Sequence, residues 1–222
     1  MAQVVKIISI EHLTHDVIKI VAEKPEYLLY QPGQAVDVSI NKEGWEEKLR
    51  AFTFTSLPNE DHIEFTIKTY PSHHGVTEQL LVLSVGDELL IHDPFGDISY
   101  KGEGIFIAGG AGVTPFIAIF KQLEKDHKVG DNKLIFANKT KADIIQADKF
   151  ITLLGCNFIN VLSAERLDHY EHGYITAELI KNHIKSENDY FYICGPEPMM
   201  QAVENHLSVL EITDSHIVRE AF

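Results

Sequence analysis

The stretch Gly109-Gly110-Ala111-Gly112-Val113-Thr114-Pro115 follows an apolar segment, residues 105–108, and precedes a run with helical periodicity, residues 115–125. Glycines let a phosphate approach the main chain, and the first turn of a helix offers unpaired N–H groups with partial positive charge. Proline suits that turn, because its missing N–H would be unpaired there in any case. The stretch therefore predicts a dinucleotide-binding loop.

This loop departs from the Gly-x-Gly-x-x-Gly fingerprint, because Pro115 stands where the third glycine would be. An alternative explanation is a tight turn that packs closely on a sheet and binds nothing. The strand before the loop and the helix after it favour the binding interpretation.

Downstream of the loop, strand-like and helix-like segments alternate, which is typical of a parallel sheet with helices on both faces. The predicted strands are residues 105–108, 133–137, 157–162, 189–194 and 216–220, and the predicted helices are residues 115–125, 142–154, 176–183 and 197–209. We therefore expect an α/β nucleotide-binding domain over residues 100–222.

Upstream of the loop, the chain contains short β-rich segments separated by turn residues. The predicted strands are residues 4–10, 16–22, 34–40, 49–55, 62–68 and 88–92, and one helical turn is expected at residues 77–81. Six strands at this spacing predict a small antiparallel β-barrel over residues 1–99.

A second turn, Cys194-Gly195-Pro196-Glu197-Pro198-Met199, lies between a predicted strand and a predicted helix. The carboxyl edge of a parallel sheet is where such folds bind ligands. A cysteine that ends an apolar strand is more often part of the core. Its Gly-Pro neighbours favour a functional interpretation, although no basic partner marks Cys194 as a nucleophile.

The segment Arg50-Ala51-Phe52-Thr53 carries ligand-binding side chains on one predicted barrel strand. Arg50 and Phe52 are two residues apart and share a face, so a guanidinium able to hold a diphosphate lies beside an aromatic ring. Thr53 adds a hydroxyl able to reach a ring nitrogen. The pattern predicts a flavin-binding strand; the alternative is a barrel strand with one exposed arginine.

The segment after the next strand strengthens this prediction. Ile67-Lys68-Thr69 is followed by His74-Gly75-Val76-Thr77, where a glycine and a hydroxyl residue open a short helix. Unpaired N–H groups at such a point suit a phosphate. Two phosphate-binding elements, Arg50 and the Gly75 turn, fit a diphosphate, so we expect FAD rather than FMN. His74 could contact the ligand, or be an ordinary loop histidine.

Four motifs occur in an order that resembles the ferredoxin–NADP reductase superfamily over essentially the whole chain. They are the Arg-x-aromatic-Thr strand, the Lys68 to Thr77 segment, the glycine-rich loop and the Cys-Gly-Pro turn. The resemblance implies a barrel that binds flavin and an α/β domain that binds NAD(P)H. The family usually has tyrosine where this chain has Phe52. The phenylalanine ring preserves stacking but removes a phenolic hydrogen bond.

The same resemblance implies roles for several further residues. Cys194, with Gly195, Pro196 and Met199 near it, would border the nicotinamide. Glu220 would lie near the reacting centre, and Phe222 would cover the flavin. An ordinary loose terminus is the alternative for Phe222.

Asn138 and Lys139 begin a segment similar to that of NADH-using cytochrome reductases of this superfamily, so we expect them at the adenosine end of the nucleotide. NADPH users more often carry arginines there. We therefore expect NADH rather than NADPH, although Lys139, Lys141 and Arg166 could bind a phosphate.

Together these features predict an enzyme that transfers hydride from a nicotinamide to flavin N5. Thr53, Cys194 and Glu220 are the expected catalytic residues. The electrons would pass to a ferredoxin, flavodoxin, cytochrome, oxygenase component or free flavin. The alternatives are an electron-transfer subunit of a larger oxidoreductase and a non-catalytic flavin- or nucleotide-binding module.

Composition limits the other classes of function. A formal net charge of −14 over 222 residues argues against a nucleic-acid or anionic-membrane partner. No apolar run is long enough for a membrane span, and the first residues do not resemble a signal peptide, so a cytoplasmic location is expected. The two cysteines are too few to hold an iron–sulfur cluster, and no metal site is expected. The oligomeric state is not indicated.

Overall fold

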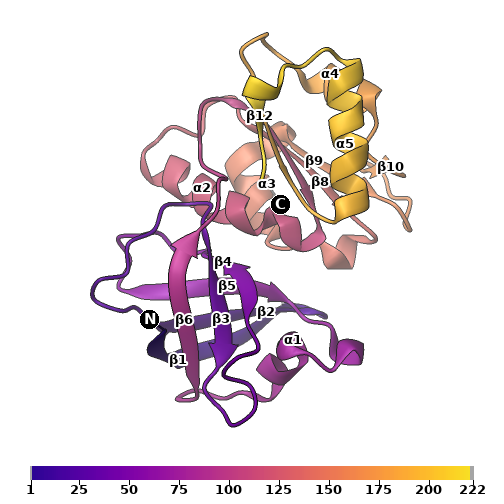
Figure 1. Cartoon of the computed structure of the whole chain (residues 1–222). Coiled ribbons are helices and arrows are strands. Elements are labelled where there is room, and N and C mark those ends of the chain that lie inside the picture. The colour runs from indigo at the N-terminus through magenta and orange to yellow at the C-terminus, as the bar shows by residue number, and fades with distance from the viewer. Residues whose placement is uncertain (1, 221–222) are drawn as a thin grey trace.

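The computed structural model describes residues 2–220, and its N-terminal part is a six-stranded antiparallel sheet. The strands are β1 (Gln3–Thr14), β2 (Val17–Glu23), β3 (Ala35–Ile40), β4 (Arg50–Thr53), β5 (His62–Lys68) and β6 (Glu88–Phe95), in the order β4-β3-β6-β1-β2-β5. Phe54, directly after β4, forms an antiparallel bridge with Phe65 on β5. This bridge joins the two edges of the sheet and closes it into a barrel (Figure 1).

Alternating apolar residues fill the interior of this barrel. Ile20, Val36, Phe65 and Ile91 come from four different strands and are completely buried in one cluster. One end is covered by η1 (Pro71–His73), α1 (Val76–Gln79) and η2 (Leu80–Val82). The helical turn expected at residues 77–81 is therefore present, and it continues as a 3₁₀ turn.

The C-terminal part is a six-stranded sheet in which every pair of neighbours is parallel. Its strands are β7 (Gly104–Gly109), β8 (Lys133–Asn138), β9 (Phe158–Leu162), β10 (Glu171–His172), β11 (Tyr190–Cys194) and β12 (Ile217–Val218), in the order β10-β9-β8-β7-β11-β12. The helices are α2 (Thr114–Lys125), α3 (Ala147–Leu154), α4 (Ala177–His183) and α5 (Glu197–Val209).

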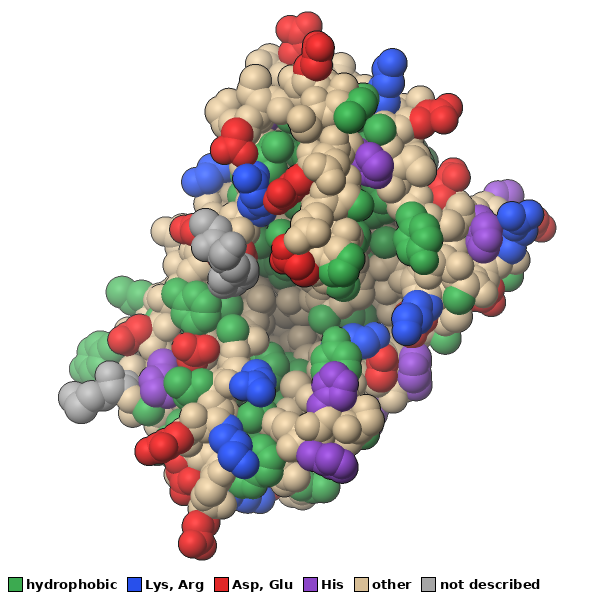
Figure 2. All heavy atoms as spheres, turned by 45° about the vertical axis from the view of Figure 1, so that its right-hand side comes forward, with side chains coloured by type: hydrophobic (Ala, Val, Ile, Leu, Met, Phe, Trp, Pro, Cys, Tyr) green, Lys and Arg blue, Asp and Glu red, His purple; other side chains and the backbone are tan. Residues whose placement is uncertain are grey.

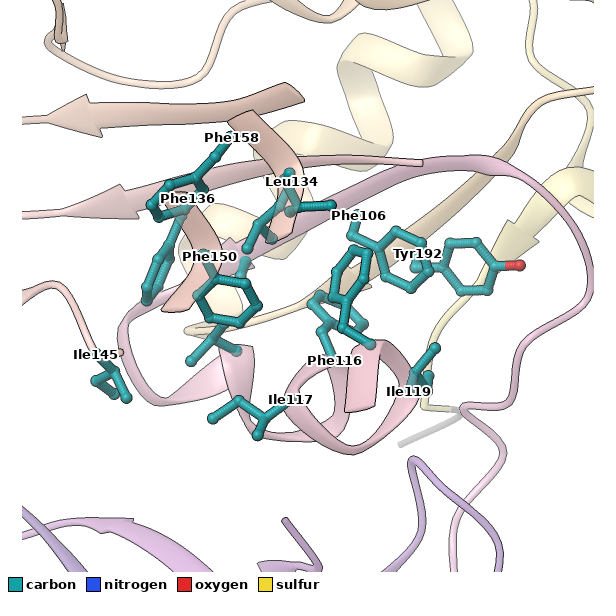
Figure 3. Close-up of a cluster of buried hydrophobic side chains, with 14 of the residues drawn as sticks. Phe106, Phe116, Ile117, Ile119, Leu134, Phe136, Ile145, Phe150, Phe158 and Tyr192 are labelled. Atoms are coloured by element: carbon teal, nitrogen blue, oxygen red, sulfur yellow. The ribbon is translucent and has the colours of Figure 1, made fainter. Parts of the chain in front are cut away.

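Residues that alternate along these strands fill two separate cores. Phe106 and Tyr192 pack with Phe116 of α2 on one face of the sheet, as Figure 3 shows. Ile107 and its neighbours pack with Val203 of α5 on the other face. Both faces are covered because a parallel sheet is apolar on both sides. The predicted fold class, an antiparallel barrel followed by a parallel α/β domain, is confirmed.

Two predicted elements of the α/β domain are markedly shorter than expected. A helix is expected over residues 142–154, but α3 begins only at Ala147. Thr140 and Asp143 form a capping box around a single 3₁₀ turn, η4 (Lys141–Asp143), and Gln146 has a left-handed φ of 54° that interrupts the helical path. The predicted strand at residues 216–220 is reduced to β12: η6 (Asp214–His216) includes its first residue, and the pairing with β11 ends at Val218.

The two domains share a packed interface. Val17 of β2 and Ile98 of the linker are buried in the same cluster as α2 and the first face of the parallel sheet. The linker is also packed from the barrel side, since a Cβ on Gly33 would lie 2.3 Å from the Ile98 carbonyl oxygen. Among residues 2–220, no helix combines the length and apolar composition required to cross a membrane.

Candidate functional site

A cleft of about 840 Å³ lies between the barrel and the α/β domain. Figure 2 shows the surface hollowed between the two parts of the molecule. Ten of the predicted site residues line it: Lys68, Gly110, Ala111, Gly112, Asn138, Lys139, Cys194, Gly195, Pro196 and Met199. The structure thus brings one residue of the predicted flavin site, Lys68, to the same cleft as most of the predicted nucleotide site.

The glycine-rich loop forms η3 (Gly110–Val113) and leads into α2. A Cβ on Gly112 would lie 2.2 Å from the carbonyl oxygen of Cys194, so the loop and the Cys-Gly-Pro turn are in direct main-chain contact. Gly110 has a left-handed φ of 51°, and a Cβ there would meet no atom within 4 Å. The loop is therefore packed against the Cys-Gly-Pro turn at Gly112 and open towards the cleft at Gly110.

The last three residues of the predicted loop lie in the protein interior and not in the wall of the cleft. Val113, Thr114 and Pro115 are buried and do not line the cleft. The Thr114 hydroxyl donates to the Ala111 carbonyl at 3.0 Å, and Pro115 is in the first turn of α2. These residues shape the loop rather than its open surface.

Asn138 ends β8 at the far side of the cleft. Its side-chain Nδ2 is buried and has no hydrogen-bond partner among residues 2–220, while its main-chain carbonyl accepts from Ser163 N at 3.0 Å. A buried amide without a partner is costly unless a ligand supplies an acceptor. Together with the open Gly110, this amide fits a nucleotide with a diphosphate and a ribose.

Cys194 keeps some contact with the cleft, but burial raises the pKa of its thiol to about 12, and the nearby Glu220 carboxylate adds to the shift. Glu220 Oε2 accepts from the main-chain N–H of Asp97 at 3.0 Å. A Cβ on Gly96 would lie 2.9 Å from Glu220 Oε1. The C-terminal segment therefore contacts both the barrel and the neighbourhood of Cys194.

The burial of Cys194 predicts that the two cysteines differ in reactivity. A thiol with a pKa near 12 is protonated at pH 8, with about one part in ten thousand as thiolate, and only the thiolate is a nucleophile. We expect iodoacetamide at pH 8 to label exposed Cys156 more than tenfold faster than Cys194 in the native protein. Peptide mass spectrometry measures the two rates, and urea-unfolded protein is the control. Equal native rates would contradict the buried thiol.

The predicted flavin strand lies outside the cleft. Arg50 and Ala51 are exposed on β4, an edge strand of the sheet, and within residues 2–220 the Arg50 guanidinium donates only to the carbonyl of Leu49, at 2.8 Å. Phe52 packs against the barrel core beside Phe65, with 6.4 Å between ring centroids. An arginine without an acidic partner suits a diphosphate.

Strand register relates Thr53 to the region around Glu220. Thr53 is paired with Ala35 on β3, and Ala35 is paired with Phe95 on β6. The next residue after Phe95, Gly96, lies against Glu220. The end of the predicted flavin strand is thus two strands away from the residues that contact the Cys194 region.

The second predicted phosphate-binding segment is divided by the fold. Lys68 lines the cleft and its Nζ lies 2.6 Å from Asp16 Oδ2, whereas Ile67 and Thr69 are buried. Burial alone would raise the pKa of Asp16, but the hydrogen bond and charge of Lys68 lower it. The other members lie away from the cleft lining: His74, which pairs with Glu78 at 3.1 Å, Gly75, Val76 and Thr77.

Several residues of the cleft were not predicted as site residues from the sequence. They are His15, Asp16, Tyr70, Ala137, Asp143, Ser163, Gly173 and Tyr174, whereas Gly109 belongs to the predicted glycine-rich loop. Asp143 and Ser163 follow the strands β8 and β9, so their positions at the carboxyl edge of the sheet were a usable signal. Phe222 lies outside the described residues.

Within residues 2–220, one group of three side chains has metal-ligand geometry: His15, Asp16 and Asp143. Asp16 is already paired with Lys68, and Asp143 Oδ2 accepts from the main-chain N–H and hydroxyl of Thr140. These existing partners favour an electrostatic contact between the domains over a metal site.

Comparison with known proteins agrees with this architecture. The ferredoxin NADP+ reductase from Neisseria gonorrhoeae, solved with bound FAD and NADP, superposes with a TM-score of 0.78 at 20% identity, covering 94% of this chain and 91% of that one. Residues 4–100 match the family model of the oxidoreductase FAD-binding domain, and residues 106–205 match that of the oxidoreductase NAD-binding domain. The chain belongs to the ferredoxin–NADP reductase superfamily.

Two relatives within this superfamily have informative names. The reductase component of propane 2-monooxygenase from Mycolicibacterium goodii is 25% identical, over 98% of this chain and 66% of its own length. NADH-cytochrome b5 reductase 1 from Aspergillus terreus is 29% identical, over 88% of this chain and 72% of its own length. The chain spans less than two thirds of the length of the first curated relatives that it matches.

Proposed function

We propose that this protein is an FAD-dependent NAD(P)H oxidoreductase that passes electrons to a separate acceptor. In this proposal residues 1–99 bind FAD and residues 100–222 bind the nicotinamide dinucleotide. The family models over residues 4–100 and 106–205 support the assignment of one cofactor to each part.

One observation carries the proposal: the glycine-rich loop and the Cys194 turn meet at one interdomain cleft, and the Glu220 carboxylate lies near the Cys194 thiol. Glu220 is also bonded to the main chain that follows β6 in the barrel. A reaction between two cofactors held by different domains requires such a shared cleft, because the reacting atoms must approach to about 3–3.5 Å.

On the barrel side, the residues of β4 are assigned to the flavin. The free guanidinium of Arg50 would hold the diphosphate, Phe52 would pack on the ring system, and the Thr53 hydroxyl would hydrogen-bond near the reacting nitrogen. Ala51 lies between them, on an edge strand whose main chain is accessible.

The segment from Ile67 to Thr77 would complete this site. Lys68 has a half-buried charge paired with Asp16, while Ile67 and Thr69 hold the strand end in position through the core and through a hydrogen bond to the Asp16 carbonyl. The turn His74-Gly75-Val76-Thr77 would supply main-chain donors. Two phosphate-binding elements favour FAD over FMN.

On the α/β side, Gly110, Ala111 and Gly112 would hold the pyrophosphate, with Val113, Thr114 and Pro115 shaping the loop beneath. Asn138 and Lys139 would contact the adenosine end. Cys194, with Gly195, Pro196 and Met199, would form the wall beside the nicotinamide. A neutral thiol suits this role, because it adds no charge to a site where hydride moves.

When bound, the two cofactors supply the chemistry: hydride transfer from nicotinamide C4 to flavin N5, followed by release of electrons one at a time. The chain's own contribution is alignment and electrostatics. Glu220 would act near the reacting centre, where its carboxylate is oriented by the Asp97 N–H.

The electron acceptor is proposed to be a separate carrier: a ferredoxin, flavodoxin, cytochrome, oxygenase component or free flavin. The name of the Mycolicibacterium goodii relative, a reductase component, favours an oxygenase component and also supports the second candidate, an electron-transfer subunit of a larger oxidoreductase. Steady-state assays with purified carriers distinguish these acceptors.

We expect NADH to be preferred over NADPH by at least tenfold in kcat/KM. The Asp143 carboxylate lines the cleft near Asn138, and a carboxylate repels a 2′-phosphate but accepts a hydrogen bond from a ribose hydroxyl. Steady-state kinetics with both nucleotides measures the ratio. A tenfold preference for NADPH would contradict the assignment and indicate that Lys139 binds the phosphate.

The proposed function is tested by adding NADH anaerobically to protein loaded with FAD and recording the visible flavin absorbance. Rapid bleaching is the expected result. A persistent yellow colour would indicate a binding module without reductase activity. Protein that fails to bind FAD would exclude both the reductase and the flavin module.

A further inference from the structure

A lysine of the α/β domain forms a largely buried ion pair with the barrel. Lys121 lies on α2, and its Nζ donates to Glu64 Oε1 at 2.8 Å and to the main-chain carbonyl of Thr55 at 2.5 Å. The side chains of Lys121 and Glu64 are only 17% and 11% exposed. The other ionic contact between the domains that we find in residues 2–220, His15 with Asp143, is longer at 3.6 Å and involves a largely exposed histidine.

Glu64 is itself held firmly in the barrel. The Thr55 hydroxyl donates to Glu64 Oε1 at 2.8 Å, and the Thr55 main-chain N–H donates to the Glu64 carbonyl at 2.8 Å. This is the place where the chain after β4 meets β5 and closes the barrel through the Phe54–Phe65 bridge. Lys121 is therefore attached to a rigid part of the barrel.

Each end of this contact is close in sequence to a proposed cofactor-binding element. Thr55 is two residues beyond Thr53, the last residue of β4. Lys121 is seven residues along α2 from Thr114, which is about 10 Å at the rise of an α-helix. Because a packed helix moves as a unit, the ion pair connects the glycine-rich loop to the flavin strand.

The hydrogen bond from the Asp97 N–H to the Glu220 carboxylate is also directional, but it holds the C-terminal segment and not the helix that follows the glycine-rich loop. Val17 and Ile98 bury apolar surface against the α2 side of the sheet, and such contacts are not directional. A lysine with two acceptors at hydrogen-bond distance is directional. The surroundings also disfavour unpaired cations: burial lowers the pKa of nearby Lys149, and the charge of Lys121 lowers it further. Lys121 is tolerated there because Glu64 and Thr55 compensate it.

We propose that Lys121 is a positioning residue that sets the orientation of the glycine-rich loop relative to the flavin-binding strand, without touching either cofactor. The inference depends on the proposed reductase function. Its consequence is kinetic: a misplacement of about 1 Å between reacting groups can reduce the rate about a hundredfold, while each binding site stays intact within its own domain.

The test compares FAD-loaded wild type with Lys121→Met, which keeps the length of the side chain but removes its charge. Anaerobic stopped-flow reduction at several NADH concentrations yields the limiting rate and the apparent Kd separately, and flavin fluorescence yields the Kd of FAD. We expect the limiting rate to fall at least tenfold, with both Kd values within threefold of wild type.

Three companion variants sharpen the result. The double variant Lys121→Met with Glu64→Gln leaves no buried unpaired carboxylate, so it should fold at least as well as the single variant and show the same loss of rate. Lys121→Arg should recover part of the rate. Lys125→Met, an exposed lysine of the same helix, should leave it unchanged.

A lower Tm with an unchanged limiting rate would overturn the proposal, because it would show a structural role only. A rate loss that follows weaker binding of FAD or NADH would also overturn it. The wild-type arm reports separately on the proposed function: wild type that binds FAD but is not reduced by NADH would refute the reductase, and with it the role of Lys121.

Discussion

Replacing Gly112 by alanine is expected to lower Tm by roughly 6 to 12 °C and to reduce kcat/KM for NADH at least tenfold. The added Cβ would lie 2.2 Å from the Cys194 carbonyl oxygen and 2.6 Å from Gly195 Cα, and neither main-chain atom can move without displacing the turn. Overpacking of this kind costs about 3 kcal/mol, and each kcal/mol corresponds to about 2–4 °C in a chain of this size. Calorimetry and steady-state kinetics measure the two effects.

Gly110→Ala is the matched control in the same loop. A Cβ at Gly110 would meet no atom within 4 Å, so only the cost of its left-handed φ of 51°, about 1–2 kcal/mol, applies. Its Tm should fall less than that of Gly112→Ala. The contact between the loop and the Cys194 turn would be unimportant if Gly112→Ala kept the wild-type Tm, or if Gly110→Ala were the less stable variant.

Replacing Arg50 by alanine is expected to raise the Kd of FAD about ten- to hundredfold. Charge-assisted hydrogen bonds to a phosphate are worth about 1.5–3 kcal/mol, and about 1.4 kcal/mol is a factor of ten in affinity. The stability of the protein without FAD should hardly change, because the guanidinium is exposed and its one hydrogen bond in the described part of the chain is to the Leu49 carbonyl. Titration of flavin fluorescence measures the affinity, and thermal unfolding measures the stability.

Two further variants define the role of Arg50. Arg50→Lys should be intermediate, because an ammonium keeps the charge but cannot form two parallel bonds to a phosphate. Arg166→Ala, which removes another exposed arginine, should leave FAD binding unchanged. If Arg50→Ala bound FAD as tightly as wild type, the flavin strand would be an ordinary edge strand with one exposed arginine.

Local sequence patterns predicted a turn or loop correctly where a few neighbouring residues determine its backbone path. The glycines after β7 and the turn after β11 lie where predicted, because strand–turn–helix connections are specified by neighbouring residues. The pattern failed at residues 142–146, where the apolar period continues but the capping box at Thr140 and the left-handed Gln146 delay the helix. The edge strand β10 was missed, because both of its residues are exposed and show no alternation.

Only some of the residues that form the candidate site could be predicted from the sequence. Lys68 and Cys194 were identified from motifs, but their presence in one cleft depends on how the domains pack. His15 and Asp16 lie in a hairpin turn with no motif, and they reach the cleft because the barrel presents that turn to the α/β domain. Arg50, in contrast, has a clear motif and lies outside the cleft lining.

The sequence by itself determined the two sheets, their order and the positions of the glycine-rich loop and the flavin strand, because periods of two and of 3.6 residues and the backbone freedom of glycine are local properties. Only the tertiary structure decided which of these elements face one another. The contacts of Glu220 with Gly96 and Asp97, and of Lys121 with Glu64, join residues far apart in the chain. Such pairs depend on the fit of two complete domain surfaces, which no local pattern encodes.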